Sequence, residues 1–225
     1  MCGRLSIAFT PSDLARAFPY VDDPDALNAL DLPRYNVAPT QSLPAVIADG
    51  DAARWAALDW WLTPRWAKEP TRRFATFNAR AEDLAAKPAF RASFRDRRCL
   101  VIGTSFYEWK REGKQKRPFA VGLADRSPLA LAGVWDRWTD RETGEVVESC
   151  AVVTTEPNAL MAEIHDRMPV VVGPAEREVW LRGTADEARH VLRPYDPEQM
   201  TAWEVAREVG NVQNDGPECV APLAA

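Results

Sequence analysis

The chain has 225 residues, of which 46% are hydrophobic, and a formal net charge of −5 at pH 7. This length and composition predict one globular domain over residues 1–225 with a substantial core. The acidic balance argues against a general polyanion binder but leaves room for a local basic patch. No run of about 18 apolar residues predicts a membrane span, and no basic segment followed by an apolar stretch predicts a signal peptide. We therefore expect a cytoplasmic protein without a membrane partner.

The metal-ligating residue types are few and scattered. The four cysteines form no CxxC pair, and the two histidines add little binding capacity. We expect no metal site, no cofactor and reduced thiols. Cys99 and Cys150 lie in apolar runs, where a cysteine usually acts as a small buried hydrophobe.

Residues 4–9 predict a short strand, followed by a helix with a clear start. Thr10 is a favourable N-cap, Pro11 fits the first helical position and Asp13 supplies an acid in the first turn. We expect this helix to run to about Phe18.

The next segments alternate between loops and strands. Residues 34–41 predict a loop because they show little periodicity and many hydrogen-bonding groups. The apolar runs 43–49 and 53–62 predict a hairpin around Asp49-Gly50. Residues 64–73 predict a charged loop bounded by prolines.

The second half predicts further strands and then short helices. Residues 99–110 predict one long buried strand that returns at 118–123 after a polar hairpin loop. A second hairpin, 128–138 with 146–155, turns around Thr143-Gly144. The expected helices are 158–165, 174–182 ended by Gly183, and 184–192 opened by a capping box of Thr184 and Glu187.

This order of elements predicts the fold class. Strands joined by hairpins, with short helices between them, favour an α+β fold. We expect a single domain built on a mainly antiparallel, barrel-like curled β-sheet with short flanking helices.

Cys2 directly follows the initiator methionine, which is usually trimmed before a small residue. The mature terminus would then carry an α-amine, with a pKa of roughly 7.7–8.0, next to a thiol. The amine can add to an aldehyde and the thiol can then close a five-membered thiazolidine ring, an intramolecular step. Alternatively, Cys2 is simply a tolerated second residue.

Three other segments hold polar residues that packing alone does not explain. Asn78 and Arg80 follow an apolar run, Glu108 interrupts an aromatic strand, and His165 ends a predicted helix. Burial of Glu108 would raise its pKa and suit it for proton transfer, whereas strand alternation would turn it to solvent. His165 with the following aspartate could instead be a C-terminal helix cap, and Asn78 and Arg80 could be turn and surface residues.

Six segments together resemble the SRAP family, the SOS response-associated peptidases or abasic-site-processing proteins. They run from the first residue almost to the last: MCGRL at 1–5, RYNVAPTQ at 34–41, NARAE at 78–82, FYEWK at 106–110, HDRMPVVV at 165–172 and VGNVQNDG at 209–216. Their order and the initial MCGR make the resemblance specific.

The resemblance implies a DNA damage-response protein that binds single-stranded DNA covalently at abasic sites. Cys2 would form a Schiff base and then a thiazolidine with the ring-opened sugar, shielding the lesion. Glu108 would relay protons, His165 would act on the opened sugar oxygen and assist reversal, and Asn78 would orient the cysteine or the sugar. The flanking phosphates would be held by Arg4, Arg80 and Arg167.

Trp66 resembles the family's aromatic wedge beside the lesion. This sequence has Arg65-Trp66-Ala67 where two adjacent aromatics are expected, and Trp60-Trp61 where tryptophan-glycine is expected. The resemblance further implies a monomer that joins the nucleoid when bound to DNA. Lyase-like activity and peptidase activity on the protein's own amino terminus are possible additions, whereas general proteolysis is not expected.

Two other function classes remain open. A class II glutamine amidotransferase also uses an N-terminal cysteine in an MCG start, but the accompanying arginine-glycine and asparagine-glycine framework is not found here. A protein of the same fold could also read modified or single-stranded DNA without any chemistry. Aldehyde-dependent covalent capture separates that reader from the crosslinking protein.

Overall fold

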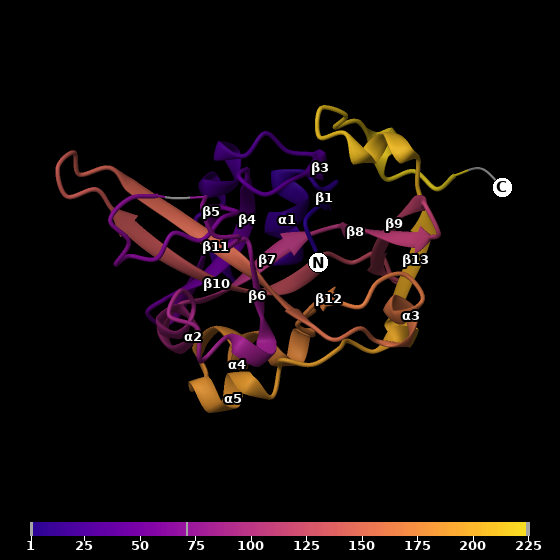
Figure 1. Cartoon of the computed structure of the whole chain (residues 1–225). Coiled ribbons are helices and arrows are strands. Elements are labelled where there is room, and N and C mark those ends of the chain that lie inside the picture. Colours follow the sequence, from indigo (N-terminus) through magenta and orange to yellow (C-terminus); the bar gives the residue numbers. More distant parts are fainter. Residues whose placement is uncertain (1, 71, 224–225) are drawn as a thin grey trace.

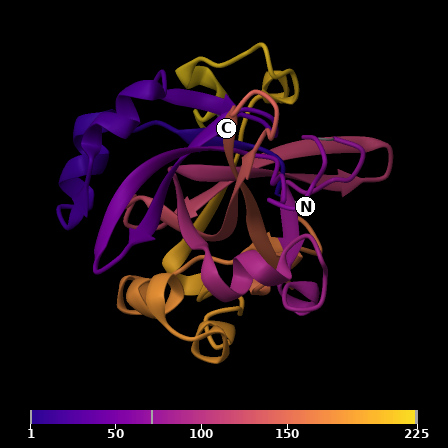
Figure 2. The ribbon, with the colours of Figure 1, turned by 90° about the vertical axis from the view of Figure 1, so that its left-hand side faces the viewer.

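Residues 2–70 and 72–223 are described by a computed structural model (Figure 1). Five of its strands close into a ring. They are β4 (Ser42–Asp49), β5 (Ala52–Asp59), β7 (Arg98–Gly103), β10 (Leu129–Thr139) and β11 (Val146–Thr155). The pairs β5–β4, β4–β7, β7–β10 and β10–β11 are antiparallel, and a parallel contact between Ser149 and Asp59 closes the ring. The curling of these strands is visible in Figure 2. The prediction of a mainly antiparallel, barrel-like sheet is confirmed.

A second sheet packs against this barrel, in the order β13-β9-β8-β1-β3. Its strands are β1 (Leu5–Ile7), β3 (Arg34–Val37), β8 (Ser105–Glu112), β9 (Gln115–Leu123) and β13 (Met200–Glu204). The amino-terminal strand is therefore internal, with β3 on one side and β8 on the other. This arrangement fixes the chain directly after Cys2.

Shorter strands extend the barrel sheet. β2 (Val21–Asp22) pairs with β5, and β12 (Met168–Pro169) with β11. β6 (Asn78–Arg80) also pairs with β11, in parallel register.

Short helices cover one face of the barrel. They are α1 (Pro11–Ala17), α2 (Arg91–Asp96), α4 (Arg177–Arg182) and α5 (Ala185–Arg189), while α3 (Ala159–Ala162) precedes β12. Short 3-10 helices lie at Pro24–Ala29, Ala81–Asp83, Pro174–Glu176, Pro197–Gln199, Arg207–Gly210 and Pro217–Cys219. The N-cap predicted at Thr10 is present and forms a capping box with Asp13, and the capping box predicted at Thr184 is also present.

The strand alternation divides the buried side chains into two clusters. On β7, Leu100 and Ile102 pack with the helices, whereas Cys99 and Val101 pack in a second cluster. That second cluster, named here the inner core, also contains residues of β1, β3, β8 and β9, together with Cys2. The amino terminus thus meets the interior of the barrel.

The predicted long strand 99–110 is wrong in one respect, because it breaks at Thr104 into β7 and β8, which belong to different sheets. The chain crosses β1 here: Thr104 N donates to Ser6 O at 2.7 Å, and Thr104 Oγ1 accepts from Ala8 N at 2.7 Å. A side chain at Gly103 would meet Ser6 O at 3.1 Å, so this corner suits glycine.

Other boundaries also differ from the prediction. The 34–41 segment is not all loop, because its first four residues form β3. The 158–165 helix is reduced to one turn, α3, whose N-cap Asn158 accepts from Met161 N at 2.9 Å. The turn at Gly113, with φ of +62°, makes the β8–β9 hairpin tighter than expected. Within the described part of the chain, no helix has the length and apolar character needed to span a bilayer.

Candidate active site

Cys2 has no exposed surface and lies in the inner core. Asn78 Nδ2 donates to the Cys2 carbonyl oxygen at 2.5 Å. Asn78 reaches this position because β6 pairs in parallel with β11, with Asn78 opposite Val152. Its amide oxygen, Oδ1, is buried and has no hydrogen-bond partner among the described residues. The site therefore holds an acceptor beside the amino terminus that is ready for a donor.

Glu108 lies on β8 and is 3% exposed. It shares a strand face with Phe106, which packs in the inner core with Cys2. The opposite face, with Tyr107, packs under the carboxyl-terminal segment, so both faces of the strand are covered. The alternative of a solvent-facing Glu108 is therefore wrong. Burial raises the pKa of Glu108, and the charge of His165 opposes part of that rise.

His165 follows α3 and faces Glu108, with its Nε2 3.8 Å from Glu108 Oε2. The backbone N–H of Arg167 points to His165 Nδ1 at 3.1 Å, and Asp166 Oδ1 lies 2.9 Å from the same nitrogen. In the neutral ring Nδ1 can accept from Arg167 N–H, which places the ring proton on Nε2, toward Glu108. In the charged ring Nδ1–H can donate to Asp166.

The Cys2 thiol is held in its protonated form. Burial raises its pKa well above the ordinary value, and the nearby negative charge of Glu108 raises it further. A buried neutral thiol is a poor first nucleophile but can react once its proton has an acceptor. Cys2, Asn78, Glu108 and His165 are thus brought together from four distant segments.

The three predicted phosphate ligands lie in different environments. Arg80 is exposed at the end of β6, on the same strand face as Asn78. Arg167 makes a paired contact with Glu82 at 2.6 and 3.0 Å, and donates to Thr154 O at 2.7 Å. Arg4 donates through Nη1 to groups within the fold and lies over the Trp109 ring, 5.8 Å from its centroid. Of the three, Arg80 is the one presented to solvent.

Trp66 is 61% exposed, in the loop between β5 and β6. Phe74, later in the same loop, is 64% exposed and was not singled out from the sequence. Arg73 lies over its ring at 5.8 Å. Two exposed aromatics among arginines fit a surface on which bases could stack. The clustering of arginines before Phe74 was the available sequence signal.

Two hollows adjoin the site. One, of about 360 Å³, is lined by Glu108, Trp109, Arg111, Lys116, His165 and Gly210. The other, of about 730 Å³, shares Trp109, Arg111 and His165 with it. We call this pair the His165 groove. Glu108 and His165 both line the smaller of the two hollows.

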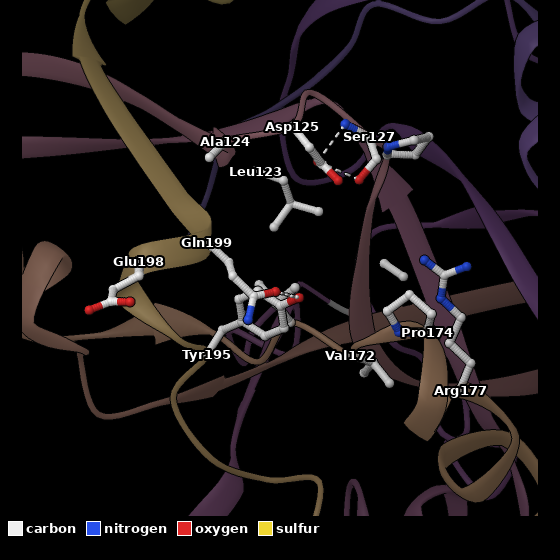
Figure 3. A pocket seen from close by; sticks show the side chains of 13 residues that line it. Leu123, Ala124, Asp125, Ser127, Val172, Pro174, Arg177, Tyr195, Glu198 and Gln199 are labelled. Atoms are coloured by element: carbon white, nitrogen blue, oxygen red, sulfur yellow. Dashed lines mark hydrogen bonds between the residues drawn. The ribbon is translucent and has the colours of Figure 1, made fainter.

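A separate pocket of about 300 Å³ is lined by none of the predicted site residues (Figure 3). Several of its polar groups already have partners within the fold. Asp125 accepts from the N–H and hydroxyl of Ser127 at 2.9 and 2.8 Å, and Tyr195 O–H donates to Gln199 at 3.1 Å. Across residues 2–70 and 72–223, no group of three or more His, Cys, Asp and Glu side chains is arranged to hold a metal ion.

Sequence reasoning also missed the role of Asn36 and Asp215. Asn36 is 1% exposed and bonds to both chain-terminal segments, and Asp215 accepts from the backbone of β3. Both residues lie in motifs that carried the family resemblance, RYNVAPTQ and VGNVQNDG, but polar composition alone did not reveal that the two motifs touch.

Comparison with known proteins shows the family of this chain. The family model described as SOS response associated peptidase (SRAP) matches residues 1–212. "Abasic site processing protein YoqW" of Bacillus subtilis (strain 168) is 37% identical over 224 residues, covering 98% of this chain and 99% of the relative. "Abasic site processing protein HMCES" of Xenopus tropicalis is 29% identical, covering 99% of this chain and 78% of the relative.

A solved structure of a protein from Bacteroides thetaiotaomicron aligns with a TM-score of 0.88 at 26% identity, covering 99% of this chain and 100% of the other. The similarity of fold therefore extends over almost the whole chain, including the barrel and the second sheet. On the strength of the family model and the B. subtilis relative, this chain belongs to the SOS response associated peptidase (SRAP) family.

Proposed function

We propose that this protein acts in the DNA damage response by linking covalently to abasic sites in single-stranded DNA through Cys2, after removal of Met1. The observation that carries the proposal is the site itself. The Cys2 carbonyl is held by Asn78, and Glu108 and His165 face each other at 3.8 Å beside it. The names of the relatives, which describe abasic site processing, agree with this substrate.

The proposed chemistry needs no oxidant or reductant. The α-amine of Cys2 adds to the C1′ aldehyde of the ring-opened sugar, and loss of one water gives a C=N bond. The thiol then adds across that bond: sulfur bonds to C1′ and the thiol proton ends on nitrogen. The raised pKa of the thiol supports this order, because the amine is the better nucleophile at neutral pH and the thiol reacts only within the formed imine.

Glu108 would move the protons of these steps. In its neutral form, favoured by burial, it can protonate the departing hydroxyl, and as carboxylate it can accept the thiol proton. His165 would protonate or steady the opened sugar oxygen and assist reversal of the crosslink. The unpartnered Oδ1 of Asn78 would accept from the α-amine or from a sugar hydroxyl.

The DNA strand would be held mainly by charge and stacking. Arg80 is the exposed guanidinium beside the site, with Arg167 and Arg4 as further phosphate ligands. Trp66 would stack on a base next to the lesion. The proposal includes a monomer acting on DNA in the cytoplasm.

Two related activities belong to the same proposal. Removal of the residue before Cys2 by the protein itself would account for a peptidase activity, and an amine bound at C1′ can promote lyase-type strand cleavage. The amidotransferase alternative requires the thiol to attack first, which its raised pKa disfavours.

The test is denaturing gel electrophoresis after mixing the protein with single-stranded DNA that carries one abasic site. We expect an adduct that survives heat and denaturant, and none with intact DNA. Cys2→Ala should abolish the stable adduct, whereas Cys150→Ala, a matched change at another buried cysteine, should retain it. Intact mass of the active protein should show the loss of one methionine.

An undiminished stable adduct with Cys2→Ala would refute the proposed crosslink through Cys2. Normal crosslinking by a variant with an extended amino terminus would also contradict it, because an amide nitrogen has no basic lone pair to form the imine. A protein that binds abasic DNA tightly without any covalent product would instead be the non-covalent reader.

A further inference from the structure

The two motifs without a role in the proposed chemistry, RYNVAPTQ and VGNVQNDG, meet in one hydrogen-bonded network at Asn36. Asn36 lies on β3 and is 1% exposed. Its Nδ2 lies within hydrogen-bond distance of three carbonyl oxygens of the carboxyl-terminal segment: Val209 at 3.0 Å, Asn211 at 3.0 Å and Asn214 at 2.7 Å. A single amide thus holds a turn of irregular backbone closed.

The same asparagine holds Arg4. Arg4 Nη1 donates to Asn36 Oδ1 at 2.6 Å and to the Val209 carbonyl at 2.7 Å. Both polar atoms of the Asn36 amide are therefore used. Its Oδ1 accepts from Arg4, and its Nδ2 donates to the carboxyl-terminal segment, which Arg4 also contacts at Val209. Because Arg4 lies two residues after Cys2, this network fixes the start of the chain against its end.

Asp215 locks the segment to β3 at a second point. Its Oδ1 accepts from the backbone N–H groups of Tyr35 and Asn36, both at 2.6 Å, and its Oδ2 accepts from Arg34 Nε at 3.1 Å. Hydrogen bonds to an ionised acceptor are among the strong ones in proteins. The segment is thus anchored independently of Arg4.

The anchored segment also borders the site. Gly210, between Val209 and Asn211, lines the His165 groove together with Glu108, Trp109 and His165. On the other side of the segment, Val209 packs with Tyr107, the neighbour of Glu108 on β8.

We propose that residues 209–215 form a fixed wall of the His165 groove, where the DNA strand would lie. Asn36 is then a positioning residue that holds Arg4 against this wall, so that its guanidinium faces the strand. This inference rests on the proposed function for the identity of the strand. Without Asn36, Arg4 would lose its acceptor, and the carbonyls of the wall would lose their shared donor. Its guanidinium would then sample many rotamers, and ordering it on DNA would cost affinity.

The first measurement is the binding of intact single-stranded oligonucleotide as a function of salt. Arg4→Gln should lower the slope of log affinity against log salt by about 0.7, the value for one phosphate contact on a single strand. Asn36→Ala should reduce affinity about fivefold to tenfold at low salt and lower the slope in the same direction. In the Arg4→Gln background, Asn36→Ala should have a much smaller effect on affinity and none on the slope, because the residue it positions is gone and only the loosening of the wall remains.

Arg98→Gln is the matched control for general loss of stability. Arg98 is also a buried arginine that donates to backbone carbonyls, those of Phe94 and Arg95 at 2.7 and 3.0 Å, but it lies on the helix-covered side of the barrel. We expect its DNA affinity and salt slope to match those of the unmodified protein at a temperature where every variant is folded. Additive effects of Asn36→Ala and Arg4→Gln, or a wild-type slope for Asn36→Ala, would overturn the positioning role.

Hydrogen–deuterium exchange without DNA keeps this inference separate from the proposed function. Asn36→Ala should speed amide exchange both in the peptide covering 2–8 and in that covering 207–219, while Arg98→Gln leaves both protected. Unchanged protection of the two peptides would overturn the wall even if crosslinking occurs. A protein with the expected exchange but no adduct on abasic DNA would refute the proposed function and leave the wall standing.

Discussion

Replacing Glu108 with glutamine tests the proton relay directly. Glutamine keeps the size and most of the hydrogen-bonding capacity of the buried side chain but cannot transfer a proton. General acid–base catalysis contributes about 10²- to 10⁴-fold to rates. His165 Nε2 lies 3.8 Å from the carboxylate and can transfer protons in part when Glu108 cannot. We therefore expect the lower end, with crosslinking slowed by about 10²-fold and affinity for intact DNA unchanged.

The same substitution should stabilise the fold near neutral pH. Burial raises the pKa of Glu108, so between the unfolded pKa of about 4.3 and the higher folded value the folded state binds the extra proton. Stability therefore falls as the pH rises through this window, and the loss is complete above the folded pKa. Glu108→Gln removes this loss. Its melting temperature should exceed that of the wild type at pH 7, and the difference should vanish below about pH 4.

The assay is a time course of adduct formation at saturating abasic DNA between pH 6 and 8, quenched in denaturant and resolved on gels. Thermal unfolding at pH 4 and 7 completes it. Glu112→Gln is the matched control, because it changes a half-exposed carboxylate at the far end of the same strand. Wild-type kinetics for Glu108→Gln across this pH range would refute the relay. If Glu108→Gln melted below the wild type at pH 7, the conclusion that burial of the ionised Glu108 carboxylate destabilises the fold would be refuted.

Three further changes probe the surroundings of the site. His165→Ala should let crosslinks accumulate but alter their decay after excess unmodified DNA is added, whereas His190→Ala, at the exposed end of α5, should leave both rates unchanged. Arg80→Ala should lower the salt slope of single-stranded DNA binding by about 0.7 without sequence preference, and Arg16→Ala on α1 should not; equal slopes would remove Arg80 from the interface. Trp66→Ala should weaken binding by about 1–3 kcal/mol if a base stacks there, measured by fluorescence anisotropy, and an unchanged affinity would exclude that stacking.

The sequence was most informative where local rules act alone. The helix beginning at Pro11 and the α5 helix start where the N-cap at Thr10 and the capping box at Thr184 predict, because a cap depends on residues three positions apart. The hairpin turns at Gly50 and Gly144 are also as predicted, since both glycines adopt a positive φ. Closure of the barrel, by contrast, depends on a contact between Ser149 and Asp59, which no local pattern encodes.

The environment of Glu108 shows why alternation can mislead. Period-two reasoning assigns one strand face to solvent, but β8 is covered by the inner core on one side and by the carboxyl-terminal segment on the other. The break at Thr104 was missed for a related reason, because β1, almost a hundred residues earlier, causes it. The partners of Arg4 and Arg167 likewise come from distant segments.

The sequence predicted only in part how the four site residues are arranged. These residues are Cys2, Asn78, Glu108 and His165. Their residue types indicated proton transfer and amine chemistry, and the family resemblance named them. Sequence did not predict that Asn78 bonds to the Cys2 carbonyl, or that β6 lies parallel to β11. A parallel register of three residues has no recognisable signature, because strand pairing is set by the whole sheet.

The internal position of β1 sets an order of events during synthesis. β1 can pair fully only after β8 has been synthesised. The hydrogen bond from Arg4 to Val209 can form only later, because Val209 lies 205 residues further along the chain. The chain is synthesised at about 5–20 residues per second, so the interval between the emergence of β8 and the emergence of Val209 is roughly 5–20 s. Until then the bond between Arg4 and Val209 cannot form, so a cellular aminopeptidase would reach the amino terminus most easily while the chain is nascent. The proposed removal of Met1 by the protein itself would instead need Asn78, Glu108 and His165 in place beside the buried Cys2, so it would follow folding.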